Sequence, residues 1–219
     1  MVLTQHGINS ISRGNLYVII GDKKYPVVKI GNQLWTTENL DWKWDGLDLG
    51  YTTPINSSTP NAQYYNNDES TYGWDGYRCG LLYNYSAKEA MKNMLPSGWR
   101  IPSIADINTL KNFINSPDDG YLLSADAQWA PAWIGENLYG FNLKPFGAKA
   151  EWNGWTGIFC NITDAGNLHL SEFGYCFQRY IGGSASTRNS LLISTWRSYP
   201  LYPIRLVKDV PPDPVTIGN

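Results

Sequence analysis

Two prolines bracket a Gly-Trp pair in the stretch that decides the fold, Leu95-Pro96-Ser97-Gly98-Trp99-Arg100-Ile101-Pro102-Ser103. The prolines and the glycine fix a turn on each side of one large aromatic side chain, so we expect Trp99 to be buried. Ser103 stands where a helix N-cap is wanted, and Asp106 three residues later completes a capping box. Apolar residues at helical spacing then predict a helix from Ser103 to Asn115.

Outward from this stretch, the sequence predicts short strands, tight turns and one more helix, at Ser86 to Met94. Turns at Gly21-Asp22 and Gly31-Asn32 separate three expected strands. These three strands are Leu16–Ile20, Tyr25–Ile30 and Gln33–Trp35, and two final strands are expected at Leu191–Trp196 and Tyr202–Val207. The segment from Trp152 to Tyr180 alternates turn residues with aromatics, as in short strands joined by tight turns. We expect Leu16–Ile20 to pair with Ile204–Val207, because both are short apolar runs near the ends of the domain.

Composition favours an α+β architecture rich in loops. Charged residues make up 16% of the 219 positions, against about a quarter in typical domains, and there are ten Trp and fifteen Tyr. The shortage of Lys and Glu argues against a helical bundle. We expect an N-terminal arm and first strand at 1–20, one domain at 21–208, and a Pro-rich tail at 209–219.

Charge and hydropathy exclude two classes of partner. The net charge is −2 and no run of Lys or Arg occurs, so we expect no nucleic-acid binding. No apolar run approaches the roughly 18 residues that span a bilayer, so we expect no membrane insertion. No signal peptide is visible, and two alternatives for localisation stay open: synthesis in the cytoplasm, as for a phage virion component, or a bacterial surface protein whose export signal this sequence lacks.

Few side chains here suit catalysis or metal binding. Only two His occur, and the three Cys (Cys79, Cys160, Cys176) form no CxxC pair, so we expect buried thiols and no zinc; a Cys160–Cys176 bridge remains an alternative. Nucleophile and nucleotide motifs are absent. Asp45, Asp48 and the cluster at 66–69 offer oxygen ligands for Ca²⁺, but turn formation explains them better. We expect no catalytic residue, no metal and no cofactor.

Five ordered segments carry a resemblance to a known family. Together they resemble the Fibrobacter succinogenes major paralogous domain family, which is similar to C-type-lectin-like and formylglycine-generating-enzyme folds. The resemblance spans residues 21 to 208 and implies a C-type-lectin-like fold, with short helices flanking twisted antiparallel strands and long irregular loops. The segments are Lys29–Leu40, Gly80–Ala87, Pro96–Pro102, Gly140–Gly147 and Ile204–Lys208.

The resemblance also implies a range of functions. Some proteins with this fold are the variable proteins of diversity-generating retroelements, which display a rewritten C-terminal segment on a fixed scaffold. We therefore expect a non-enzymatic module that recognises a protein or glycan on another cell. An oxidase similar to the formylglycine-generating enzyme, using Cys160 and Cys176, is one alternative, although nothing around them resembles its site. A structural module of a surface or virion protein is the other. Calcium-dependent sugar binding lacks its motif, since Glu151-Trp152-Asn153-Gly154 has no Asp.

The final third of the chain is where we place the binding surface, at 150–203. Tyr, Trp and Arg dominate binding energy at interfaces because they bury much area and still donate hydrogen bonds. If they do so here, several should form one exposed patch. The residues chosen are Tyr175, Phe177, Arg179, Tyr180, Trp196, Arg197, Tyr199 and Tyr202, with Trp152 and Trp155 as weaker candidates.

Overall fold

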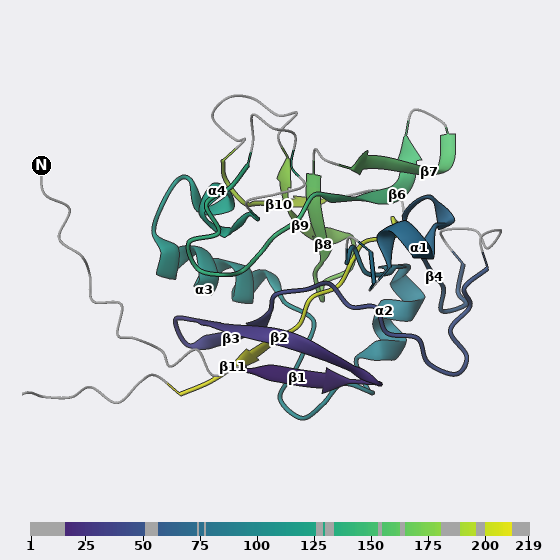
Figure 1. Ribbon diagram of the computed structural model, residues 1–219, viewed down its shortest axis with the longest axis horizontal. Helices are drawn as coiled ribbons and strands as arrows, with labels where there is room; N and C mark the ends of the chain where they lie inside the picture. Colours follow the sequence, from purple (N-terminus) through teal and green to yellow (C-terminus); the bar gives the residue numbers. More distant parts are fainter. Residues whose placement is uncertain are drawn as a thin grey trace, which may run out of the picture.

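The computed structural model describes most of the chain and has mixed α+β architecture (Figure 1). It describes residues 16–50, 57–73, 75–76, 78–125, 129, 134–152, 155–162, 165–180, 189–195 and 200–211, with backbone alone at 150–152, 155–158, 160–162 and 180. The strands are β1 (Tyr17–Ile20), β2 (Lys23–Ile30), β3 (Gln33–Thr36), β4 (Ala62–Gln63), β5 (Leu82–Tyr83), β6 (Phe146–Trp152), β7 (Trp155–Ile162), β8 (Ala165–His169), β9 (Tyr175–Tyr180), β10 (Leu192–Thr195) and β11 (Val207–Asp209). The helices are η1 (Tyr65–Asn67), α1 (Glu69–Tyr72), α2 (Tyr85–Met91), α3 (Ile104–Ile114) and α4 (Asp119–Leu123).

A four-stranded antiparallel sheet brings the two ends of the domain together, in the order β1-β2-β3-β11. The predicted turns are confirmed: Gly21 and Gly31 both have positive φ, which glycine adopts at little cost. The predicted pairing of the first strand with the last is wrong. β11 pairs with β3, with Val207 opposite Trp35, so β1 lies at the other edge of the sheet.

Helix α3 confirms the capping box read from the sequence. The Ser103 hydroxyl accepts a hydrogen bond from the Asp106 N–H at 3.1 Å, and the Asp106 carboxylate accepts one from the Ser103 N–H at 2.8 Å. The helix ends at Ile114 and is followed by its C-cap Asn115, which adopts the left-handed conformation. Its buried face (Ile107, Leu110, Ile114) packs in a core cluster with Trp35. The capping residues Ser103 and Asp106 therefore determine where this helix begins.

Trp99 is half-buried, so the prediction that it is buried holds only in part. Its ring packs against a second core cluster that contains Tyr25 and Leu206, but the turn residues before it, Ser97 and Gly98, are exposed. The turn therefore lies at the surface and covers only one side of the indole. Helix α2 is shorter than predicted and ends at Met91.

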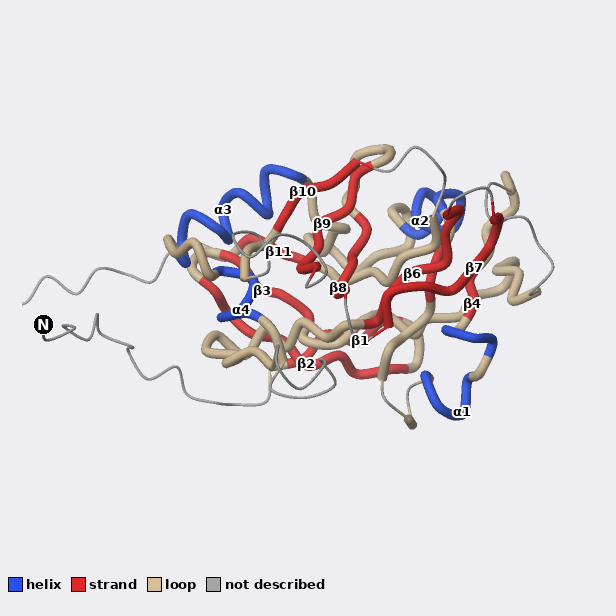
Figure 2. The backbone as a smooth tube through the Cα atoms, turned by 90° about the horizontal axis from the view of Figure 1, so that it is seen from above, coloured by secondary structure: helices blue, strands red, loops and turns tan. Residues whose placement is uncertain are grey.

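The second half of the domain consists of short strands, as the alternation of turn residues with aromatic residues predicts. β6 and β7 form an antiparallel hairpin, and β8, β9 and β10 form a sheet in the order β10-β9-β8. Figures 1 and 2 both show α3 and α4 at one end of the domain and α1 and α2 at the other. Within the described ranges, no helix has the length and apolar character needed to cross a bilayer.

Candidate recognition surface

Strand β9 carries four of the predicted binding residues, and two of them are buried. Phe177 and Arg179 are both 0% exposed, whereas Tyr175, on the same face at the start of the strand, is 38% exposed. Their assignment to an exposed patch is therefore wrong for Phe177 and Arg179. The physical reason is position: β9 is the central strand of its sheet, and its inner face joins the main core cluster. Tyr180 ends the strand, where its Cα pairs with Ala165.

Arg179 is accommodated in the core by aromatic rings. Its guanidinium carbon lies 4.6 Å from the ring centroid of Trp129 and 5.8 Å from that of Tyr121, within range for cation–π attraction. Burial lowers the pKa of Arg179 to about 10, so the side chain stays protonated at neutral pH. Its role in the described structure is to fill the space beneath β9.

Tyr202 is also buried, at 2% exposure, which corrects its assignment to the surface. Its backbone exchanges hydrogen bonds with Tyr83, at 2.9 and 3.2 Å, so this segment is joined to the end of β5. The ring packs with Ala148 and Cys176 and meets His169 edge-on, with centroids 5.2 Å apart. Tyr202 therefore belongs to the core.

The other predicted residues are placed by their backbone or lie outside the described residues. Trp152 and Trp155 are Cα partners at the end of the β6–β7 hairpin. Trp196, Arg197 and Tyr199 lie outside the described residues. Thr195, directly before them, is exposed and is the Cα partner of Tyr175. Tyr175 is thus exposed beside the point where the chain enters 196–199.

A turn that sequence reasoning missed presents the most exposed aromatic side chain among the described residues of this region. Phe173, between β8 and β9, is 56% exposed and meets the ring of Tyr85 edge-on, with centroids 4.8 Å apart. The sequence signal for an exposed aromatic was a Phe inside the turn-forming run Ser171-Glu172-Phe173-Gly174. We call Phe173, Tyr175 and Thr195 the Phe173 surface.

Lys88 of α2 holds the backbone of this turn. The side chain is 1% exposed, and its ammonium group donates hydrogen bonds to the carbonyl oxygens of Leu170 (2.9 Å), Ser171 (3.1 Å) and Glu172 (3.3 Å). The ammonium also lies 4.7 Å from the ring centroid of Tyr85. Burial lowers the pKa of Lys88 to about 8. Three carbonyl groups that point at one buried cation fix the turn in a single conformation.

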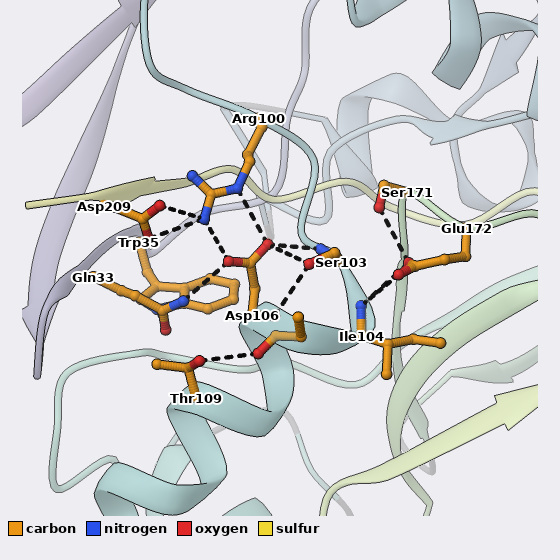
Figure 3. Close-up of polar contacts among 11 residues, drawn as sticks. Gln33, Trp35, Arg100, Ser103, Ile104, Asp106, Thr109, Ser171, Glu172 and Asp209 are labelled. Carbon is orange, nitrogen blue, oxygen red and sulfur yellow. Dashed lines mark hydrogen bonds and ion pairs between the residues drawn. The ribbon is translucent and has the colours of Figure 1, made fainter.

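Glu172 ties the same turn to the N-terminus of α3 (Figure 3). Its two carboxylate oxygens accept hydrogen bonds from the backbone N–H of Ile104, at 3.0 and 3.1 Å, and the Ser171 N–H donates to the Pro102 carbonyl at 2.7 Å. A carboxylate at a helix N-terminus is favoured by the unpaired N–H groups there. The turn is therefore clamped between two helices while Phe173 faces solvent.

Two buried titratable groups of the domain, His169 and Cys79, have pKa values shifted by burial. Burial, aided by the charge of Lys88, lowers the pKa of His169 to about 3, and its Nε2–H donates to the Tyr83 carbonyl at 2.7 Å. Burial raises the pKa of the Cys79 thiol to about 12, so the thiol stays protonated. In the part of the chain that the structure describes, no three His, Cys, Asp or Glu side chains gather closely enough to hold a metal ion.

Comparison with known proteins gives a family. The sequence model of the Fibrobacter succinogenes major domain matches residues 28–170, from β2 to the end of β8. This match is shorter than the span of 21–208 read from the sequence, and it ends directly before the turn that carries Phe173. Neither the curated proteins nor the solved structures compared with the chain gave a match. Because the family match covers well over half of the sequence, the chain belongs to the Fibrobacter succinogenes major domain family.

Proposed function

We propose that this protein is a non-enzymatic recognition module that binds a protein or glycan on another cell through the Phe173 surface. The observation that carries the proposal is the exposed Phe173 ring on a turn whose backbone is fixed by Lys88 and by Glu172. Large aromatics dominate binding energy at interfaces. A turn that is already ordered loses little conformational entropy when it binds.

The strand register supports a larger surface. Tyr175 and Thr195 are paired on β9 and β10, and the residue after Thr195 is Trp196. We propose that Trp196, Arg197 and Tyr199 extend the Phe173 surface, with Tyr180, Trp152 and Trp155 as outer candidates. Phe177, Arg179 and Tyr202 are left out because they are buried.

The scaffold in this proposal is C-type-lectin-like, and the chain is a variable protein of a diversity-generating retroelement. Supporting this, the family match stops at residue 170, so the surface lies in the part of the chain that the family pattern does not cover. Sequencing the locus from many isolates tests it. Substitutions clustered in 150–203 at adenine-rich codons support diversification, and an even scatter opposes it.

Binding is tested with fluorescently labelled protein on a glycan array and on a panel of bacterial cells by flow cytometry. The double variant Phe173→Ser, Tyr175→Ser should lose at least about tenfold in affinity for whatever glycan or cell the parent binds. Phe113→Ser is the matched control, since Phe113 is 53% exposed on α3, and it should bind as the parent does. Equal binding by all three proteins, or no binding by the parent, rejects the proposal in favour of a structural module.

The oxidase alternative is tested separately. A Cys160→Ser, Cys176→Ser variant that folds and keeps the parent's binding removes that alternative. A parent that oxidises a cysteine-containing peptide, with that activity lost in the folded variant, contradicts the non-enzymatic proposal.

A further inference from the structure

Strand β1 forms an apolar edge of the four-stranded sheet, and it is independent of the Phe173 surface. Three of its side chains face solvent: Leu16, which directly precedes the strand, is 49% exposed, and Tyr17 and Ile19 are each 52% exposed. β1 pairs with β2 on one side, and none of the strands in the described ranges pairs with its other side. Figure 1 shows β1 at the outer boundary of the domain.

Within the described residues, β1 lacks several of the devices that prevent edge strands from joining. Natural edge strands are protected by inward or flanking charges, by proline, or by bulges. β1 has the sequence Tyr-Val-Ile-Ile, without a charge or a proline, and its register with β2 runs unbroken from Tyr17 to Ile20. An unprotected apolar edge of this kind is suited to pairing with another strand.

The backbone of β1 offers four hydrogen-bonding groups on the open side. The Leu16 carbonyl accepts a hydrogen bond from the Val27 N–H at 2.9 Å, so residue 16 faces β2. Because backbone groups alternate in direction along an antiparallel strand, Val18 and Ile20 also face β2. The N–H and C=O groups of Tyr17 and Ile19 therefore point outward, away from the sheet.

We propose that two copies of this chain form a two-fold dimer by antiparallel pairing of β1 with β1. In the pairing register Tyr17 lies opposite Ile19 of the second copy, and Val18 lies opposite Val18. Two independent features favour this register over the others. It uses all four outward backbone groups of each copy, and it matches exposed side chains with exposed side chains and core-facing ones with core-facing ones.

The side chains of the seam are complementary. The two outer rows each place Tyr17 of one copy against Ile19 of the other, which is a favourable aromatic and β-branched cross-strand pair. No charge lies in the seam, so no like charges oppose each other. Lys24 of each copy belongs to β2, where its ammonium group lies 4.9 Å from the Tyr17 ring centroid, and the two copies of Lys24 fall in different rows.

The size of the seam sets the strength of the dimer. Stable interfaces bury about 800 Å² on each partner, and a seam of four residues with three exposed apolar side chains falls short of that. The dimer should therefore form in the micromolar range or weaker and be visible as concentration-dependent association.

Sedimentation velocity on the full chain, from about 5 to about 500 µM, is the first test. The parent should shift from monomer towards dimer across this range. Ile19→Lys places a charge in the seam and should weaken association at least about tenfold. Leu138→Lys is the control, because Leu138 is 59% exposed on a loop away from β1, and it should associate as the parent does. A parent that stays monomeric, or a control that is weakened equally, overturns the proposal.

Cysteine cross-linking tests the register. Residues that exchange both backbone hydrogen bonds have Cα atoms about 5.5 Å apart, which suits a disulfide. Mixing Tyr17→Cys with Ile19→Cys under mild oxidation should give a cross-linked heterodimer and little homodimer of either variant. Dominant homodimers, or no cross-linked species, overturn the proposed register, and thermal melting verifies that both variants are folded.

Discussion

The ammonium nitrogen of Lys88 lies 2.9 Å from the carbonyl oxygen of Leu170, which joins helix α2 to the end of β8 across 82 positions of sequence. Two further carbonyls, of Ser171 and Glu172, accept from the same group. The buried ammonium group thereby supplies these three carbonyl groups with a hydrogen-bond donor. The contact joins the turn that carries the exposed ring of Phe173 to helix α2.

Replacing Lys88 should destabilise the protein clearly. Lys88→Met keeps most of the buried volume but removes the donor to the Leu170 and Glu172 carbonyls and leaves the Ser171 carbonyl only Lys92. We expect a loss of about 2 kcal/mol in the free energy of unfolding. Lys92→Met is the control. Lys92 also donates to the Ser171 carbonyl, but its side chain is 36% exposed, so we expect a loss of about 0.5 kcal/mol or less. Denaturant titration measures both, and equal losses would contradict the anchoring role of Lys88.

Acid should destabilise the fold through His169. Its pKa is about 3 in the folded state and about 6.5 in an unfolded chain, so between these values the unfolded state binds more protons. The free energy of unfolding should therefore fall as pH falls through this window, by roughly 2–3 kcal/mol from pH 7 to pH 4.5. Denaturation of the parent and of His169→Gln at both pH values isolates this contribution. The same pH dependence in both proteins would assign the acid sensitivity to other groups.

Local signals in the sequence predicted the parts of the fold that local chemistry decides. The Ser103–Asp106 capping box and the turns at Gly21 and Gly31 depend on residues a few positions apart, and the structure has all three. The burial of Phe177 could not be read in this way. It depends on β9 lying between β8 and β10, which only the tertiary arrangement fixes.

In the candidate site, too, the sequence predicted local features but not those that depend on the tertiary arrangement. Tyr175 was found because aromatic content marks contact surfaces, but composition does not separate an exposed Tyr175 from a buried Tyr202. Lys88 was missed because a lysine on a short helix reads as a surface residue. Its partners lie on a turn more than eighty positions away, and no local pattern reports such a contact.

Gly80 should tolerate no side chain. Its φ is +73°, and a Cβ there would lie 2.5 Å from the Leu40 carbonyl oxygen, a backbone atom that cannot move aside cheaply. Gly46 offers a matched control, because its φ is +92° and a Cβ there would have no atom within 4 Å. Gly46→Ala should cost about 1 kcal/mol from backbone strain alone, and Gly80→Ala at least about twice as much. Thermal melting compares the two, and a smaller loss for Gly80→Ala would show that the backbone at Leu40 shifts freely.

Removing the Glu172 carboxylate should weaken the start of α3 and loosen the turn that carries Phe173. Both carboxylate oxygens accept from the Ile104 N–H, so Glu172→Ala leaves a helix N-terminus without one of its caps, at a cost of about 1 kcal/mol. Glu136→Ala, at an exposed loop position, is the control and should leave stability unchanged. Hydrogen exchange adds a local measurement: the amide of Ile104 should exchange faster in Glu172→Ala, and so should that of Ser171, which donates to Pro102. Faster exchange at Ile104 with no change at Ser171 would show that Glu172 caps the helix without holding the turn.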